Sequence, residues 1–225
     1  MKKNVEFYCT REGNTICPFT KTKCIKINRQ ILGACAFSHL QNETVICPRI
    51  FKKINFEEII SKRVLGTDSF LVLKEVKIGN NFIDQIIVDG KDNNNFCGVE
   101  IQALDTTGNI ESLFGEKYKP FCVNWKTTIK TIQSQLLEKI SIFKKNKKSI
   151  VLVIQDIFFQ RMFSKKYCFD LNKEFHVLVL KYVDKTLSFV DLYSYTLDEY
   201  INEILDVNDY PLAKLVQEKI KQFVL

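Results

Sequence analysis

The chain has 225 residues, of which 46% are hydrophobic, with only eight Gly and four Pro. This composition describes a compact globular protein and excludes a low-complexity chain. With just two His in the chain, a His-based hydrolase is not expected, and no Walker-type phosphate loop indicates ATP dependence. Polar Asn4 and Glu6 follow the first lysines, so we expect no signal peptide, and the longest aliphatic run, 150–154, is too short to span a bilayer. We therefore expect a cytoplasmic protein without membrane contact.

The net charge of +7 lies entirely in residues 1–53, which carry ten Lys or Arg against three Glu. Residues 54–225 hold 23 basic and 23 acidic residues and therefore balance. Positive charge gathered in one region is typical of a surface that binds phosphates. The length predicts one sizeable core, 54–225, with a small appended subdomain, 1–53.

The same basic region holds five of the eight cysteines, namely Cys9, Cys17, Cys24, Cys35 and Cys47. Cytoplasmic thiols stay reduced, which favours a metal cluster over disulfides, and four thiolates favour Zn²⁺ or iron. Their spacing is wider than in zinc fingers, and free Cys also packs as a small hydrophobic residue, so both interpretations stay open. His39 is an alternative ligand in this region. We expect the three later cysteines to lie in the core: Cys97, Cys122 and Cys168.

Hydrophobic spacing predicts the elements of the core. Residues 127–144 have apolar side chains at helical spacing, and the all-apolar run 150–154 indicates a buried strand reached by a βαβ crossover. His176 lies in an apolar strand and is expected to be a core histidine with a satisfied ring. In chain order we predict helix 56–63, strand Phe70–Ile78, hairpin strands 83–88 and 97–104, helix 127–144, strand 150–154, hairpin strands 175–182 and 187–193, and helices Leu197–Leu205 and 212–223.

The most informative stretch is the first hairpin, whose turn spans 89–95 and where Asp89 is expected only to serve the turn. Asp84 lies on its first strand, and Glu100 and Gln102 share one face of its second strand. Acids on strands usually face solvent. However, Asp84 and Glu100 interrupt strands that are otherwise apolar, and buried carboxylates require a partner or a hard cation such as Mg²⁺. The pair predicts a metal-dependent nuclease.

Ile83-Asp84 and the run 98–108, with Glu100-Ile101-Gln102 inside it, resemble the active-site hairpin of the NotI family of type II restriction endonucleases. That family belongs to the PD-(D/E)xK nucleases and has Gln where most of them have Lys. The Pro of the motif name is absent, because Ile83 precedes Asp84. Four of the early cysteines also look like the metal-binding region that such enzymes carry ahead of the catalytic core: Cys17, Cys24, Cys35 and Cys47. Cys9 does not match that region.

The resemblance implies an α/β (α+β) fold of the PD-(D/E)xK restriction-endonuclease-like kind, in which a mixed sheet is flanked by helices and follows a small four-cysteine subdomain. It implies iron in that subdomain, although the residues alone leave iron and zinc open. It also implies that Asp84, Glu100 and the Ile101 carbonyl bind a catalytic Mg²⁺, and that Gln102 orients water or phosphate.

Further site residues are expected from their positions. Glu75, on the strand before the hairpin, is a candidate auxiliary acid, with Glu57 and Glu58 as alternatives. The candidates for DNA contact lie in the basic region and are Lys21, Lys23, Lys26, Arg29 and Arg49.

The function expected from these features is that of a type II restriction endonuclease. It would cleave double-stranded DNA at a specific palindromic site by Mg²⁺-dependent hydrolysis, leaving 5′-phosphate and 3′-hydroxyl ends. Palindromic sites mirror two-fold symmetry, so we expect a homodimer, and the resemblance implies functional pairing with a cognate DNA methyltransferase. The rival hypothesis is a non-catalytic, metal-containing DNA-binding protein, and a third is a DNA-repair nuclease of the same fold.

Overall fold

The computed structural model describes residues 5–7, 16, 34–39, 42–45, 47–79, 81–103, 125–183 and 186–205. These residues form a six-stranded sheet of order β4-β5-β6-β7-β8-β9 and a three-stranded sheet of order β1-β2-β3. The large sheet consists of β4 (Phe70–Ile78), β5 (Asn81–Asp89), β6 (Phe96–Gln102), β7 (Ile150–Gln155), β8 (Phe175–Val183) and β9 (Thr186–Tyr195). The small sheet consists of β1 (Val5–Phe7), β2 (Ala34–His39) and β3 (Asn42–Val45). The helices are the 3-10 helix η1 (Pro48–Lys53), α1 (Phe56–Ile60), the π-helical turn η2 (Ser61–Leu65), α2 (Trp125–Lys145), α3 (Asp156–Met162) and α4 (Leu197–Leu205).

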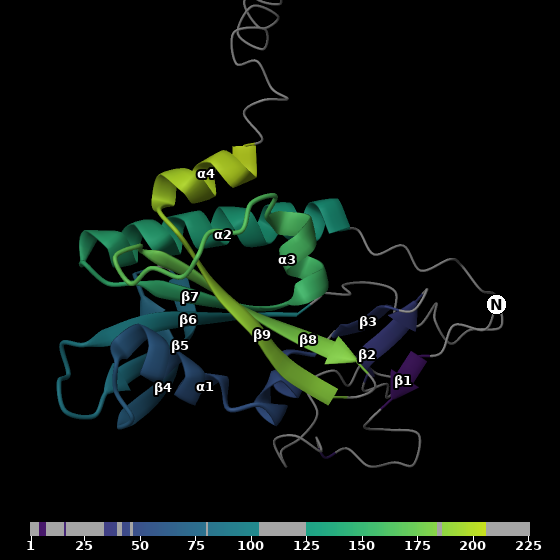
Figure 1. Cartoon of the computed structure of the whole chain (residues 1–225), viewed down its shortest axis with the longest axis horizontal. Helices are drawn as coiled ribbons and strands as arrows, with labels where there is room; N and C mark the ends of the chain where they lie inside the picture. The colour runs from purple at the N-terminus through teal and green to yellow at the C-terminus, as the bar shows by residue number, and fades with distance from the viewer. Residues whose placement is uncertain are drawn as a thin grey trace, which may run out of the picture.

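The large sheet is mixed, as predicted. Strands β4, β5 and β6 pair antiparallel, β6, β7 and β8 pair parallel, and β9 returns antiparallel to β8. Helices α2, α3 and α4 cover one face of this sheet and α1 lies on the other (Figure 1). The parallel pairing of β6 with β7, separated by α2, confirms the predicted βαβ crossover.

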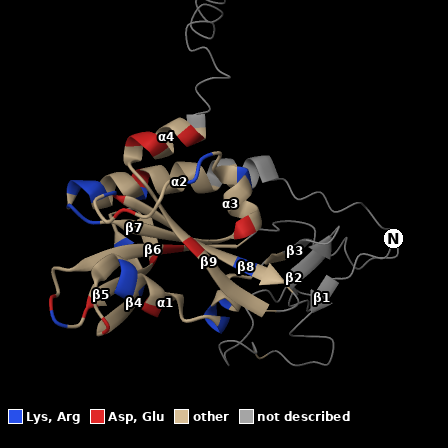
Figure 2. Cartoon of the chain, viewed as in Figure 1, with Lys and Arg blue, Asp and Glu red and all other residues tan. Residues whose placement is uncertain are grey.

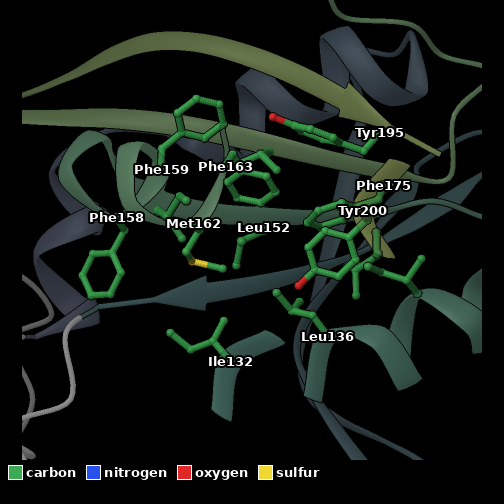
Figure 3. Packing of buried hydrophobic residues seen from close by; sticks show 14 of the residues in the cluster. Ile132, Leu136, Leu152, Phe158, Phe159, Met162, Phe163, Phe175, Tyr195 and Tyr200 are labelled. Atoms are coloured by element: carbon green, nitrogen blue, oxygen red, sulfur yellow. The ribbon is translucent and has the colours of Figure 1, made fainter. Parts of the chain in front are cut away.

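Two hydrophobic clusters hold the layers together, one on each face of the sheet. On the α2 face, Ile132 and Leu136 of the helix point toward Leu152 of β7, and the aromatic rings of α3, β8 and α4 complete the cluster (Figure 3). On the opposite face, Phe56 and Ile60 of α1 pack against the buried side chains of β5 to β9. Every residue of β7 is buried, as expected for a central strand covered on both sides.

Most of the predicted elements are confirmed, two of them residue for residue: Phe70–Ile78 and Leu197–Leu205. The predicted helix 56–63 differs from the structure. The α-helix ends at Ile60, and the chain continues as the π-helical turn η2. The N–H of Gly66 donates to the Ser61 carbonyl, and Gly66 adopts the left-handed conformation (φ 69°) that ends the turn. Helix 212–223 lies outside the described residues.

Of the three cysteines predicted to lie in the core, one is buried and one is exposed. Cys97 is fully buried, as predicted, and its burial raises the pKa of the thiol to about 12. The prediction for Cys168 is wrong, since this residue is exposed. Its neighbours turn inward instead: Tyr167 packs edge-on against Tyr195 with ring centroids 5.2 Å apart, and Phe169 packs on His176 at 5.4 Å. Cys168 between them therefore faces out. Cys122 lies outside the described residues.

Strand β3 and helix η1 pack directly on the core. The Val45 N–H donates to Gln155 Oε1 at 2.8 Å, which links β3 to the end of β7. Ile50 and Phe51 of η1 lie in the same apolar cluster as Phe56 and Ile60. The predicted boundary between 53 and 54 therefore falls inside a shared cluster, and the division into 1–53 and 54–225 stays a prediction.

Candidate active site on the first hairpin

The turn of the β5–β6 hairpin is built by short polar side chains. Asp89 Oδ1 accepts hydrogen bonds from the Lys91 N–H at 2.9 Å and the Thr67 hydroxyl at 3.2 Å, and Oδ2 accepts from Asn95 Nδ2 at 3.1 Å. These bonds lower the pKa of Asp89, with the Lys91 bond the largest cause. Asp89 is therefore committed to the turn, as predicted.

The two strands separate at their far end, where Asp84 and Glu100 meet. Cα pairing between β5 and β6 runs from Val88 with Phe96 to Gln85 with Val99 and stops there. Beyond it, Asp84 Oδ2 accepts a hydrogen bond from the Ile101 N–H at 2.8 Å. The Asp84 backbone also lies close enough to the Glu100 carboxylate to affect its pKa. Asp84 thus takes the place of a backbone acceptor for β6, and this bond brings its carboxylate beside Glu100.

The environments of the two acids differ, and for Asp84 the expectation of burial is wrong. Asp84 is exposed, because the ladder to β6 has already ended at this position. Glu100 is largely buried, with 15% of its side chain exposed, and its Oε1 lies 2.7 Å from Lys139 Nζ of α2. Burial raises the pKa of Glu100 to about 7; the Lys139 ammonium opposes this shift, and the negative charge of Asp84 adds to it.

Two further groups follow Glu100 along β6, the Ile101 carbonyl and the Gln102 amide. The N–H and C=O of a strand residue point toward the same neighbouring strand. Because the Ile101 N–H points to Asp84, its carbonyl lies on the Asp84 side as well. Gln102 Nε2 donates to the carbonyl of Ala103 at 2.8 Å, which uses one of its two amide N–H groups.

These donors fit a hard divalent cation. Mg²⁺ is held in proteins by one or two carboxylates together with other oxygens. A cation between Asp84 and Glu100 would remove the mutual repulsion that contributes to the raised pKa of Glu100. In the part of the chain that the structure describes, no group of three or more His, Cys, Asp or Glu gathers at one point. The candidate ligands of the cation are therefore the carboxylates of Asp84 and Glu100 and the carbonyl oxygen of Ile101.

The three candidate auxiliary acids are placed differently. Glu75 is exposed on β4 and has a positive φ of 52°, and the register continues on both sides of it with Lys74 opposite Gln85 and Val76 opposite Ile83. The same register sets Glu75 opposite Asp84, so the backbone irregularity lies next to the candidate site.

The alternatives on α1 lie across the sheet. Glu57 Oε1 accepts from Gln85 Nε2 at 3.3 Å, whereas Glu58 is occupied by the Lys62 ammonium at 2.7 Å. Gln85 and α1 belong to the face opposite the one where Lys139 meets Glu100. The structure does not bring Glu57 or Glu58 to the acid pair.

Of the predicted cysteine ligands, Cys35 lies on β2 and Cys47 is buried at the start of η1. Cys17, Cys24 and the non-matching Cys9 lie outside the described residues, so the four-cysteine site stays a prediction. Among the predicted DNA contacts, Lys21, Lys23, Lys26 and Arg29 also lie outside them. Arg49 is on η1.

Arg49 belongs to a basic cluster that also includes Lys52 and Lys74. Burial lowers the pKa of Lys52, and the positive charges of Lys74 and Arg49 lower it further, while Glu57 opposes them. A phosphate anion would relieve this repulsion. Elsewhere the core carries charges of both signs. Figure 2 shows acidic residues on α4, basic residues at the end of α2, and both kinds over the sheet.

Lys139 is not among the site residues predicted from the sequence. A signal was present, since Lys139 lies three residues after Leu136 and four before Phe143, on the apolar face of the predicted helix. A lysine on such a face requires an anionic partner. The sequence could not identify that partner as Glu100, which precedes it by 39 positions.

No protein-family model matches the sequence, and a search of curated proteins finds no significant match. Among the described residues, no helix is both long and apolar enough to cross a membrane.

Proposed function

We propose that this chain is a Mg²⁺-dependent nuclease that acts as a type II restriction endonuclease of the PD-(D/E)xK kind. The observation that carries the proposal is the hydrogen bond from the Ile101 N–H to Asp84 at the open end of the hairpin, which sets the Asp84 carboxylate close enough to Glu100 to raise its pKa. A plain structural hairpin gains nothing from two neighbouring carboxylates, because their repulsion is unfavourable.

Asp84, Glu100 and the Ile101 carbonyl would hold the metal ion. When bound, Mg²⁺ polarises a phosphate oxygen and lowers the pKa of a water molecule. Gln102 carries no charge and would orient water or phosphate through its amide. Hydrolysis would leave 5′-phosphate and 3′-hydroxyl ends. Glu75 remains a candidate auxiliary acid because it lies opposite Asp84 in the register.

Double-stranded DNA is the proposed substrate, and a palindromic site would be bound by a homodimer. The basic cluster of Arg49, Lys52 and Lys74 supports a phosphate contact, in addition to the basic residues that precede it. A cognate DNA methyltransferase would protect the host DNA from an enzyme of this class. Sedimentation with and without DNA should show two chains, and a strict monomer that nicks one strand would indicate a repair nuclease instead.

The first test is digestion of plasmid and phage DNA by the purified protein with Mg²⁺, followed by sequencing of the ends. We expect discrete fragments with 5′-phosphates, no cutting when the metal is chelated, and no cutting by Asp84→Asn or Glu100→Gln. Circular dichroism of each variant serves as the control for folding. Substantial cleavage by either variant would overturn the site, and absence of cleavage by the wild type on diverse DNA would overturn the function.

The four-cysteine site is tested separately by elemental analysis. Structural metal sites contribute folding free energy, so loss of one thiolate should release the metal. We expect about one iron or zinc ion per chain, lost on Cys17, Cys24, Cys35 or Cys47→Ser and retained in Cys9→Ser. Wild-type protein that is active without metal in this region would contradict the prediction.

One observation favours a second function, a non-catalytic DNA-binding protein. Lys139 Nζ lies 2.7 Å from Glu100 Oε1, a contact that a structural ion pair would also make. Under that hypothesis, duplex DNA would bind through the basic cluster, Asp84→Asn would change nothing, and no cleavage would occur.

A further inference from the structure

The strand that carries Glu100 brings no positive charge to the acid pair. Gln102, two residues further on, is neutral, and its Nε2 donates to the Ala103 carbonyl at 2.8 Å. Phosphodiester hydrolysis develops negative charge on the phosphate oxygens, which a fixed cation stabilises. If the hairpin is a hydrolytic site, any side-chain cation that assists the metal ion has to come from another element.

Helix α2 supplies a lysine at this point. Lys139 is only 8% exposed, and its Nζ lies 2.7 Å from Glu100 Oε1. Its neighbours on the helix, Leu136 and Ile140, are buried in the core of that face. From this apolar face of the helix the ammonium reaches the carboxylate of Glu100, beside which Asp84 lies.

The close approach of α2 to β6 is set by a glycine. A Cβ at Gly98 would lie 2.5 Å from Cζ of Phe143, so only Gly lets the helix come this near. Gly98 precedes Glu100 by two positions and faces the same side of the sheet. The glycine thus fixes the helix over the strand at the height where Lys139 reaches Glu100.

A structural role alone explains this lysine poorly. A buried ion pair loses the hydration of both charges, and an apolar pair of the same volume is often as stable or more so. The other ion pairs of the described residues are more exposed: Lys144 with Glu174, for example, leaves 41% and 22% of the two side chains accessible, against 10% and 15% for Lys139 with Glu100.

We propose that Lys139 is the cationic catalytic residue of the site, contributed by α2 in place of a lysine on the strand. The inference rests on the proposed nuclease function. In the reaction, the oxygen of water forms a bond to phosphorus and the P–O3′ bond breaks. One proton of the water ends on the 3′ oxygen, and the hydroxyl stays on the 5′-phosphate. The Lys139 ammonium donates a hydrogen bond to a non-bridging phosphate oxygen and so stabilises the charge that develops there.

The test compares Lys139→Met with a matched control on the same helix, Lys144→Met, which also loses a lysine that pairs with a sheet-side Glu. Single-turnover cleavage is measured with Mg²⁺ on DNA that the wild type cuts, and duplex binding is measured with Ca²⁺ instead. We expect Lys139→Met to slow cleavage by about 100-fold or more, with a Kd for the duplex within about threefold of wild type. Lys144→Met should change neither quantity.

A second variant separates charge from packing. Gln102→Lys, added to Lys139→Met, returns an ammonium to the same face of β6 and should recover at least about tenfold of the lost rate. A purely structural Lys139 would not be rescued in this way. Wild-type cleavage by Lys139→Met, with Glu100→Gln inactive, would overturn this inference and leave the nuclease standing. Failure of the rescue, together with a lower melting temperature of Lys139→Met, would also overturn it. Absence of cleavage by the wild type would overturn both.

Discussion

Two hairpins of the large sheet, β5–β6 and β8–β9, each carry a polar pair among apolar strands, and the surroundings of the two pairs differ. In β5–β6 the strands part beyond Gln85 and Val99, and charged Asp84 and Glu100 lie at the opening. In β8–β9 the pairing continues to Phe175 with Tyr195, and the neutral pair of His176 and Ser194 is sealed inside it.

The difference in surroundings distinguishes a candidate binding site, at Asp84 and Glu100, from a packed core, at His176 and Ser194. His176 Nδ1 lies 2.8 Å from the Ser194 hydroxyl, which also accepts the Asp170 N–H at 3.0 Å. Burial lowers the pKa of His176 to about 4, so the ring is neutral at pH 7. A neutral, enclosed pair contributes to stability only, whereas charged groups at an opening are available to a cation and a substrate.

The largest expected effect comes from replacing one residue of each pair in separate variants. Asp84→Asn keeps an oxygen that accepts the Ile101 N–H but loses the charge, so cleavage should fall by about 1,000-fold or more while stability changes by less than about 1 kcal/mol. His176→Phe should leave cleavage within about threefold and cost about 2 kcal/mol of unfolding free energy. The measurements are single-turnover rates and urea unfolding. A variant of the β8–β9 pair that abolishes cleavage without unfolding would erase the distinction.

The same comparison predicts opposite responses to pH. His176 has a folded pKa of about 4 against 6.5 for a free ring, so its contribution to stability is complete above pH 6.5 and is lost as the pH falls toward 4. Glu100 has a folded pKa of about 7 against 4.5, so its contribution is complete below pH 4.5 and is lost as the pH rises toward 7. The contribution of each group to the free energy of unfolding is about 3 kcal/mol.

In the metal-free wild type, a rise in pH increases the contribution of His176 to the unfolding free energy and decreases that of Glu100. His176→Phe should therefore leave an unfolding free energy that falls between pH 4.5 and 7, and Glu100→Gln should leave one that rises. The check is urea unfolding at several pH values in the presence of a chelator. Parallel curves for the two variants would show that neither group titrates as its surroundings indicate.

The sequence predicted the hairpin acids because both elements are local: strand alternation and a polar turn suffice to set Asp84 near Glu100. It also predicted His176 as a core residue, and the ring is buried with a partner on Nδ1, although Nε2 has none among the described residues. It could not predict the exposure of Asp84, which depends on where pairing stops, or the positive φ of Glu75 opposite it. Lys139 was missed because its contact joins distant segments, which no local pattern encodes.

A smaller effect is expected at the position that sets α2 against the hairpin. In Gly98→Ala the new methyl group would meet the Phe143 ring at 2.5 Å, and overpacking of this kind costs about 1–3 kcal/mol. The shift of α2 should also draw Lys139 from Glu100 and slow cleavage. Phe143→Leu in the same chain provides space and should recover part of the stability. Additive losses in the double variant, measured by urea unfolding, would show that the two side chains do not meet.

The smallest effect concerns the sealed pair. Ser194→Ala removes the hydroxyl that His176 Nδ1 and the Asp170 N–H share, and it creates almost no cavity. A buried group that loses its partner costs about 1–3 kcal/mol. A loss near the lower end, about 1 kcal/mol, is expected because the Asp170 N–H is only partly buried and water can replace the hydroxyl. Cleavage, duplex binding and any metal affinity should stay at wild-type values, because the pair lies on β8 and β9 and not on the open hairpin. Urea unfolding measures the loss, and the reference is Ser188→Ala, an exposed serine of the same strand β9. Equal losses at the two serines would mean that the buried pair contributes nothing beyond strand propensity, and the contrast between the hairpins would then rest on Asp84 and Glu100 alone.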